Sequence, residues 1–265
     1  MKVSLIQMKI GADKAANLAR AKALALDEAR GSDVIILPEM FCCPYSRRAF
    51  RRFAESEDGE VTRVLSDIAR ETGAYLIGGS MPEAGVSQGE EGNIYNTCFV
   101  FDPDGNRIAK HRKAHMFDIN IENGLSFRES DTLTAGEGVT KFDTPFGRFG
   151  VCICFDIRFS AFIHEMSDID FLAVPAAFNM TTGPLHWELL FRARAVDEQI
   201  FTFGCAPART RDTGYVSYAN SIAVDPFGRV IAKAGARECL ITVEVDRADV
   251  VSARRQIPIG KQSLK

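Results

Sequence analysis

Three polar residues that can do chemistry each follow directly on an apolar run of the sequence. Glu39 follows VIILP, Lys113 follows RIAKHR and Cys154 follows RFGVCI. In α/β sheets, ligands bind beyond the carboxyl ends of strands, so these three side chains can converge on one crevice. A thiol has an ordinary pKa of about 8.5 and needs a base or a cation to be a good nucleophile near neutral pH. A carboxylate, an ammonium group and a thiol together therefore predict nucleophilic catalysis.

Each of these residues also has a purely structural interpretation. Cysteine is among the most buried residue types, and Cys152 and Cys154 would share one face of a strand, which suits a pair of core residues. Glu39 can cap the next helix, and Lys113 can be a solvated side chain. A redox role for Cys152 and Cys154 ranks low, because two such thiols on a strand rarely reach disulfide geometry. The joint arrangement favours catalysis over the three separate structural readings.

The elements that must position these residues alternate between strands and helices. Apolar periodicity and turn signals predict strands at 2–8, 34–37, 74–80, 95–101, 107–111, 149–153, 171–175 and 200–206, and helices at 13–30, 59–72, 159–166 and 185–199. Pro- and Gly-containing turns at 102–105, 144–147 and 225–228 predict hairpins. This alternation predicts an α/β layer architecture in a single domain over residues 1–265. The tail, from about 250 to 265, lacks a pattern of its own, and we expect it to pack at a subunit interface.

Composition excludes several classes of protein. The chain has 265 residues, of which 46% are hydrophobic and 25% charged, as in ordinary globular proteins. Its 32 basic and 35 acidic residues give a net charge of −3, so we expect no nucleic-acid partner. No stretch is apolar and long enough for a membrane span, and residues 1–14 are typical of a first strand and not of a signal peptide. Seven scattered cysteines predict reduced thiols and a cytoplasmic location.

Three segments around the candidate residues resemble the signatures of one known superfamily. LPEMF at Glu39, HRKAHMFD at Lys113 and GVCICFDIRF at Cys154 resemble those of the nitrilase, or carbon–nitrogen hydrolase, superfamily, in the same order. The resemblance covers essentially the whole chain. Four further segments are similar to the omega-amidase branch: Tyr75–Pro82, Phe127–Gly136, Ala176–Asp197 and Gln256–Gln262. The run at 42–47 and Ser160 depart from the family pattern.

The resemblance implies a four-layer-forming α-β-β-α sandwich and a separate catalytic role for each candidate residue. Glu39 is expected to act as the general base, Cys154 as the nucleophile that forms a thioester, and Lys113 with the backbone N–H of Phe155 as the oxyanion site. Glu129, 16 residues after Lys113, matches the second glutamate of the family and is expected to orient Lys113 or the substrate amide. Its alternative interpretation is a surface acid in a polar loop. The resemblance also implies a homodimer or a higher homo-oligomer.

Omega-amidases act on ω-monoamides of dicarboxylates such as 2-oxoglutaramate, so the resemblance implies a cation for the free carboxylate. Arg158, four residues after Cys154, matches a carboxylate-binding position of the related carbamoylase branch. Its alternative interpretation is a buried ion pair with Glu165 or Asp156. The candidate substrate-binding residues are Tyr45, Phe155, Arg158, Phe178 and Thr181.

Other chemistries find little support in the sequence. His111 and His115 have the i, i+4 spacing of metal ligands on a helix, but their region is predicted to be the end of a strand, so no metal site is expected. The chain has no CxxC, G-x-S-x-G, Walker or G-x-G-x-x-G motif, and no cofactor is expected. Gly78-Gly79-Ser80 is interpreted as a strand-end turn. The remaining alternatives are another amidase of the superfamily (a deaminated-glutathione amidase, an N-carbamoyl amino acid amidohydrolase or a nitrilase) and a catalytically idle interaction protein.

Overall fold

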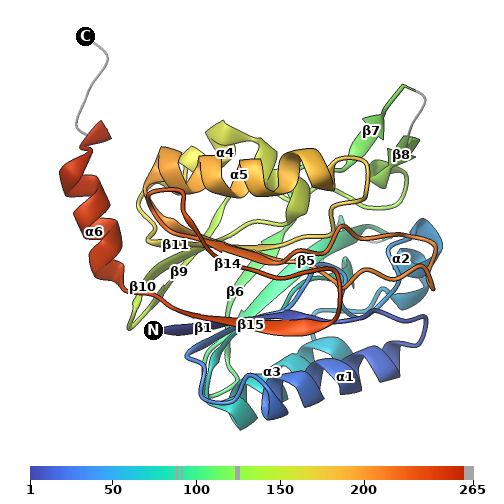
Figure 1. Cartoon of the computed structure of the whole chain (residues 1–265). Helices are drawn as coiled ribbons and strands as arrows, with labels where there is room; N and C mark the ends of the chain where they lie inside the picture. The colour runs from blue at the N-terminus through green and yellow to red at the C-terminus, as the bar shows by residue number, and fades with distance from the viewer. Residues whose placement is uncertain (87–88, 91, 123–125, 260–265) are drawn as a thin grey trace.

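A computed structural model describes residues 1–86, 89–90, 92–122 and 126–259 of the chain. Two β-sheets form its centre (Figure 1). The first sheet has the order β15 (Cys239–Glu244), β1 (Lys2–Gln7), β2 (Val34–Ile36), β3 (Tyr75–Ile77), β5 (Ile94–Phe101) and β4 (Met81–Ala84), and β6 (Arg107–Arg112) also pairs with β5. The second has the order β14 (Val230–Lys233), β13 (Ile222–Val224), β12 (Phe201–Cys205), β11 (Phe171–Pro175), β10 (Gly147–Val151) and β9 (Thr140–Thr144). A hairpin of β7 (Asp118–Asn120) and β8 (Ser126–Arg128) stands apart.

The helices cover the outer faces of the two sheets. In Figure 1, α1 (Lys14–Asp27) and α3 (Glu60–Thr72) lie beneath the first sheet, and α4 (Ser160–His164) and α5 (Gly183–Glu198) lie above the second. The short α2 (Arg47–Phe53) follows β2, and α6 (Arg247–Gln256) stands at the side of the sandwich. The layers are therefore α-β-β-α, as expected from the sequence.

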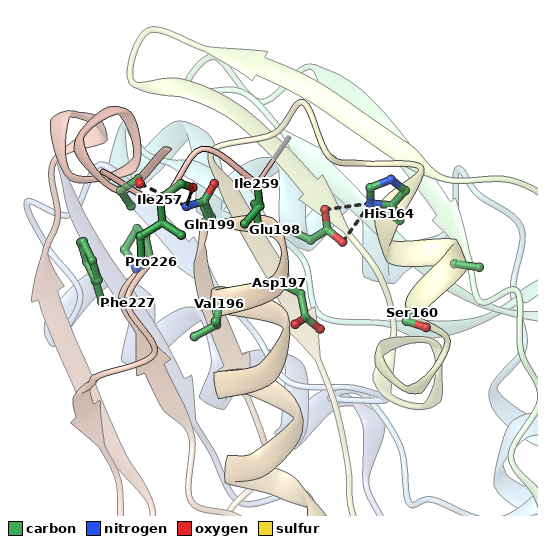
Figure 2. Close-up of a pocket in the computed structure, with 12 residues that line it drawn as sticks. Ser160, His164, Val196, Asp197, Glu198, Gln199, Pro226, Phe227, Ile257 and Ile259 are labelled. Carbon is green, nitrogen blue, oxygen red and sulfur yellow. Dashed lines mark hydrogen bonds and ion pairs between the residues drawn. The ribbon is translucent and has the colours of Figure 1, made fainter. Parts of the chain in front are cut away.

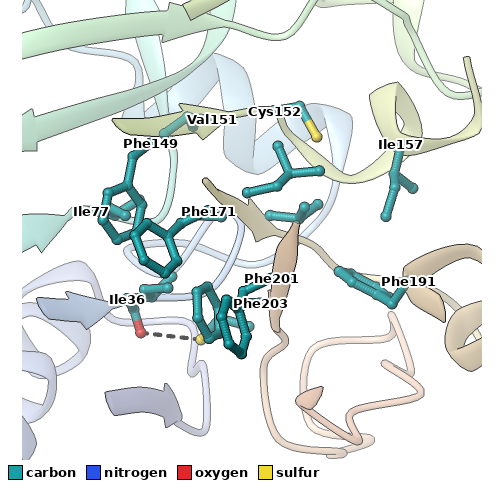
Figure 3. Close-up of a cluster of buried hydrophobic side chains, with 14 of the residues drawn as sticks. Ile36, Ile77, Phe149, Val151, Cys152, Ile157, Phe171, Phe191, Phe201 and Phe203 are labelled. Carbon is teal, nitrogen blue, oxygen red and sulfur yellow. Dashed lines mark hydrogen bonds between the residues drawn. The ribbon is translucent and has the colours of Figure 1, made fainter. Parts of the chain in front are cut away.

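The inner faces of the two sheets meet in an apolar core. Figure 3 shows Ile36 and Ile77 of the first sheet facing Phe149 and Phe171 of the second. Within the second sheet, Phe149 is in register with Phe171, and Phe171 with Phe201. Their rings stack at centroid distances of 4.8 and 5.7 Å. Such cross-strand aromatic pairs fix the strand register, and the register places the end of β10, where Cys154 follows, beside the end of β11.

Most of the predicted elements are confirmed, and their ends have local causes. The helix predicted at 13–30 is α1, whose first turn is capped by the Asp13 carboxylate, which accepts from the Ala16 N–H at 2.8 Å. The helix predicted at 59–72 is α3, and it ends at Gly73 with a left-handed φ of 68°. No described helix is both long and apolar enough to cross a bilayer.

Two helices differ from the sequence expectation. The segment 47–53, for which no helix is predicted, forms α2, which begins after the capping residue Ser46. The tail, in which the sequence shows no pattern of its own, carries most of α6. Arg247 of this helix donates to the buried Asp170 at 2.8 Å, which ties the helix to the second sheet. The end of Gln256–Gln262 lies outside the described residues, and the tail at a subunit interface stays a prediction.

Candidate active site

The ammonium group of Lys113 lies between two carboxylates in the interior of the sandwich. Lys113 Nζ is 3.2 Å from Glu39 Oε1, and 2.8 and 3.0 Å from the two oxygens of Glu129. All three side chains are 0% exposed to solvent. The Cys154 thiol lies close enough to the Glu39 carboxylate for the charge of Glu39 to raise the pKa of the thiol. Four residues scattered over more than a hundred positions of the chain therefore share one buried site.

Glu39 is fixed by contacts to both sheets. It follows β2 and Pro38, and Asn96 Nδ2 on β5 donates to its Oε1 at 2.9 Å. The backbone N–H of Ala177, just after β11 in the second sheet, donates to Oε2 at 2.7 Å. A carboxylate held on both oxygens cannot rotate, so the lone pair that faces Cys154 keeps its direction.

The turn after β3 supports the Glu39 loop. Met40, the residue after Glu39, has a left-handed φ of 51°, and its N–H donates to Ser80 Oγ at 3.0 Å. Gly79 lies against the same loop, and a Cβ at this position would collide with the Pro38 carbonyl oxygen. The Gly78-Gly79-Ser80 segment is thus more than a strand-end turn, because it holds the base in place.

Cys154 sits at the start of a short 3-10 helix, η2 (Cys154–Arg158), directly after β10. Its backbone has a φ of +48°, a conformation that costs a non-glycine residue about 1–3 kcal/mol and that occurs often at functional sites. The Phe155 N–H lies in the first turn of η2, where backbone N–H groups have no partner within the helix. A backbone donor beside the sulfur is the arrangement that an oxyanion site needs.

Glu129 is held at the opposite side of Lys113 by two further donors. It begins the short helix η1 (Glu129–Asp131). Tyr45 donates its hydroxyl to Glu129 Oε1 at 3.0 Å, and the Phe117 N–H donates to Oε2 at 2.7 Å. Glu129 therefore orients Lys113 and is not the surface acid of the alternative interpretation.

Burial and charge set the protonation states of the site. Burial raises the pKa of Glu39 above that of an ordinary glutamate; Lys113 opposes this shift and Glu129 adds to it. Burial and the Glu39 charge also raise the pKa of the Cys154 thiol, against the pull of Lys113. Burial disfavours the charged form of Lys113, but the carboxylates of Glu129 and Glu39 outweigh it and raise its pKa. These shifts favour the neutral thiol of Cys154, the charged ammonium group of Lys113 and a higher proton affinity of Glu39.

A small pocket opens on Cys154. It is lined by Phe117, Cys154, Phe155, Arg158, Ala177, Phe178 and Thr182. The candidates Phe155, Arg158 and Phe178 line this pocket, whereas Thr181 is exposed and does not, and Thr182 takes its place. A second small pocket meets Glu39 and Tyr45 from the other side.

Arg158 has no acidic partner among the described residues. Neither Glu165 nor Asp156 pairs with it; its Nη1 lies 3.2 Å from His186 Nδ1, and its Nε is buried without a partner. The guanidinium group lies over the Phe155 and Phe178 rings, 5.5 and 5.2 Å from their centroids. It is an unneutralised cation beside the nucleophile.

A larger pocket lies elsewhere. Figure 2 shows a cavity of about 710 Å³ between α4, α5 and α6, where His164 contacts Glu198 and Gln199 holds the end of α6. None of the candidate residues lines it. Chemistry, and not cavity size, identifies the site in this molecule.

His111 and His115 both lie against one buried acidic side chain. Both imidazoles contact the buried carboxylate of Asp156, at 3.2 and 2.9 Å. Within the described residues, no three His, Cys, Asp or Glu side chains gather in a way that could hold a metal ion.

Sequence reasoning missed three residues of the site. Asn96 lies inside the apolar run of β5, and a polar residue at such a position could have indicated a functional role. Ala177 contributes a backbone N–H, which no side-chain pattern reveals. Tyr215 lines the pocket behind Glu39 and donates its hydroxyl to the Ala177 carbonyl.

An α-β-β-α sandwich with a buried glutamate, lysine and cysteine at its strand ends defines a hydrolase of the nitrilase type. The model of the family "Carbon-nitrogen hydrolase" matches residues 2–255, and the chain belongs to this family. It is 45% identical to omega-amidase NIT2-A of Xenopus laevis and 42% identical to omega-amidase NIT2 of Homo sapiens, in each case over 98% of this chain and 94% of the relative.

Solved structures agree with this assignment. Nit3 of Saccharomyces cerevisiae, a member of branch 10 of the nitrilase superfamily, superposes with a TM-score of 0.89 at 39% identity, covering 99% of this chain and 96% of that one. The protein is therefore an enzyme, an amide-hydrolysing member of the carbon–nitrogen hydrolase family.

Proposed function

We propose that the enzyme hydrolyses the terminal amide of a small ω-amido acid, such as 2-oxoglutaramate to 2-oxoglutarate and ammonia, through a thioester on Cys154. The observation that carries the chemistry is the burial of the Cys154 thiol, the Glu39 carboxylate and the Lys113 ammonium group in one site, where Lys113 Nζ is 3.2 Å from Glu39 Oε1. The omega-amidase relatives support the substrate class.

In the first half of the reaction, Glu39 takes the Cys154 proton while the sulfur attacks the amide carbonyl carbon. The oxygen becomes negative and is stabilised by Lys113 and the Phe155 N–H. Glu39 then gives its proton to the leaving nitrogen, the carbon–nitrogen bond breaks, and ammonia departs. In the second half, Glu39 takes a proton from water, the hydroxide attacks the thioester, and the returning proton restores the thiol.

Arg158 supports recognition of the free carboxylate. Its cation lies in the pocket of Cys154, and the described residues supply no acid to neutralise it, so a substrate carboxylate would complete the pair. Phe155 and Phe178 flank the guanidinium group and would pack on the short carbon chain between carboxylate and amide. The Tyr45 hydroxyl is engaged by Glu129, so its contribution to substrate binding would require that contact to exchange.

The test is ammonia release from 2-oxoglutaramate, compared with an N-carbamoyl amino acid, a deaminated glutathione amide and a nitrile at equal concentration. We expect the highest kcat/KM for 2-oxoglutaramate and no turnover by the folded Cys154→Ala variant. A higher kcat/KM for one of the other substrates would assign the enzyme to that branch. No turnover of any of them, with Cys154 no more reactive toward iodoacetamide than Cys98, would favour an idle interaction protein.

We also propose that the single domain forms a homodimer, with the tail from about 250 at a subunit interface, and works in the cytoplasm. Leu185, Leu189 and Val196 share one face of α5 and are 71%, 64% and 48% exposed. Exposed apolar faces of this kind mark association surfaces. All seven cysteines are unpaired, which supports a reducing compartment. Sedimentation at micromolar protein should give the mass of a dimer, and a monomer mass would contradict the association.

A further inference from the structure

We propose that Asp156 is a positioning residue that locks the turn of the nucleophile onto the segment of Lys113, and that His111 and His115 hold it there. We call these three residues the Asp156 clamp. The proposal rests on the proposed function only in naming Cys154 as the reacting thiol, and its main readout requires no substrate.

The carboxylate of Asp156 joins two segments that are distant in the sequence. Its Oδ2 accepts from the Ile153 N–H at 3.0 Å, one residue before the nucleophile. Its Oδ1 accepts from the His115 N–H at 2.8 Å, two residues after Lys113. A single side chain thus connects the backbone beside Cys154 to the backbone beside Lys113.

The two histidines complete the contacts from either side of Lys113. His111 Nε2 lies 3.2 Å from Asp156 Oδ2, and His115 Nδ1 lies 2.9 Å from Oδ1. A carboxylate only accepts hydrogen bonds, so both of these ring nitrogens carry a proton. The His115 ring also stacks on Phe159, just after η2, at a centroid distance of 3.6 Å. The clamp therefore contacts η2 within its turn and at its end.

The charge state of Asp156 fits this role. The side chain is fully buried, which by itself disfavours a carboxylate, yet the hydrogen bonds from His111 and His115 hold its pKa well below the ordinary range. The hydrogen bonds therefore favour the ionised form of the Asp156 carboxylate. A buried, ionised and fully bonded carboxylate is a rigid support for a backbone held in an uncommon conformation.

The need for such a support comes from Cys154 itself. Its positive φ is held by the surroundings, because a non-glycine residue does not favour this conformation alone. If the turn relaxes, the sulfur moves relative to Lys113 and Glu39, and a displacement of about 1 Å can cost about 10²-fold in rate. The Asp156 clamp limits this movement of the sulfur without contacting the reacting atoms.

The experiment compares Asp156→Asn with Asp170→Asn. Asp170 is also buried and accepts from a backbone N–H and an arginine, but it lies before β11, at the opposite end of the strands from Cys154. For each variant, the rate constant of iodoacetamide alkylation of Cys154 is measured by peptide mass spectrometry, together with kcat per reactive thiol, KM and thermal midpoint. Asp156→Glu tests rescue, and His115→Gln is the milder variant, since this side chain is 26% exposed.

We expect Asp156→Asn to lower both the alkylation rate constant and kcat by about 10–100-fold with KM nearly unchanged. Asp170→Asn should lower only the thermal midpoint. His115→Gln should change the same two rates in the same direction by a smaller factor, and Asp156→Glu should recover less than the wild-type rate. If Asp156→Asn or His115→Gln has wild-type alkylation and kcat per thiol and loses only thermal stability, as Asp170→Asn does, Asp156 is merely structural. Failure of 2-oxoglutaramate as a substrate would leave the alkylation result unaffected.

Discussion

Two clusters of charged side chains adjoin strand β6, and the buried glutamates of the two clusters contact different numbers of cations. The first, the Glu39 cluster, contains Glu39, Lys113 and Glu129, so two buried carboxylates share one ammonium group. The second, the Glu83 cluster, contains one buried carboxylate, that of Glu83, which faces both Lys110 and Arg112, at 2.5 and 2.8 Å. The same two cations also pair with the partly exposed Glu57 and Glu90. Lys110, Arg112 and Lys113 lie within four residues of one another.

The charge balance determines what each cluster can do. Burial penalises both glutamates, but hydrogen bonds from Arg112, Lys110 and Thr97 reverse that penalty and lower the pKa of Glu83. At Glu39 one shared cation does not reverse it, and the pKa stays raised. Two cations on one buried glutamate therefore make a static ion pair, whereas one cation shared by two buried glutamates leaves a carboxylate that takes a proton readily.

Arg158 provides a third case, a cation with no acid. Its guanidinium group is partly buried near Cys154, and burial lowers its pKa from the ordinary value of an arginine. Within the described part of the chain its neighbours are His186, the Phe155 and Phe178 rings and the Cys154 sulfur, and none of them is a carboxylate.

The largest expected effect comes from removing the proton acceptor of the first cluster. Glu39→Gln keeps the shape of the side chain but cannot take the Cys154 proton, so we expect kcat to fall by about 10²–10⁴-fold. Steady-state ammonia release measures it, with circular dichroism to verify folding. If kcat falls by less than threefold, Glu39 is not the general base.

Lys113→Ala tests the shared cation. Loss of an oxyanion partner should lower turnover by about 10²–10³-fold or more. Lys113→Met, which keeps more of the side-chain volume, accompanies it, and both variants need a folding check because each leaves two buried carboxylates without a counter-ion. The matched control is Lys110→Ala, three positions earlier in the sequence, on β6, which should leave kcat unchanged. An equal loss of kcat in the Lys113 and Lys110 variants would contradict the view that only the Glu39 cluster takes part in catalysis.

Arg158→Met tests the unneutralised cation. Loss of a charge-assisted contact to the substrate carboxylate should raise KM for an ω-amido acid by about 10–100-fold. A simple amide without the carboxylate should show no such change. Arg148→Met, which removes an exposed arginine paired with Asp143, is the control. A KM that rises equally for both substrates would assign Arg158 to packing.

The smallest effect on catalysis is expected in the second cluster. Glu83→Gln should leave kcat and KM within twofold of wild type and lower the free energy of unfolding by about 1–3 kcal/mol. Because the folded pKa of Glu83 is lowered, its stabilisation is present above the unfolded pKa of about 4.3 and is lost as the pH falls through the folded pKa. Denaturant unfolding at pH 7 and pH 3 should therefore give a smaller difference at the lower pH. A constant difference would contradict the ionic origin.

The residues of the site were predictable to different degrees. Glu39, Lys113 and Cys154 stand at strand ends, a position that the sequence shows directly, whereas the Ala177 N–H is a backbone group that becomes a ligand only through the packing of the two sheets. The orientation of Tyr45 toward Glu129 likewise depends on tertiary contacts.

The fold was predictable wherever apolar periodicity was strong. β11, predicted at 171–175, has those bounds in the structure. Helix α2 was missed because four arginines obscure its two buried residues, Ala49 and Phe50. Helix α6 does carry a signal in its capping Asp246 and its basic last turn, but its low hydrophobicity hid the pattern.

The account depends most on Glu39 being a base of raised pKa, and the pH dependence of kcat/KM tests this directly. Glu39 must be ionised to accept the Cys154 proton, so activity is lost as the pH falls through its pKa in the free enzyme. We predict an acidic limb whose midpoint lies above the ordinary glutamate value of about 4.3, in the wild type and equally in Glu83→Gln. A midpoint at or below that value in a stable, folded enzyme would contradict the account.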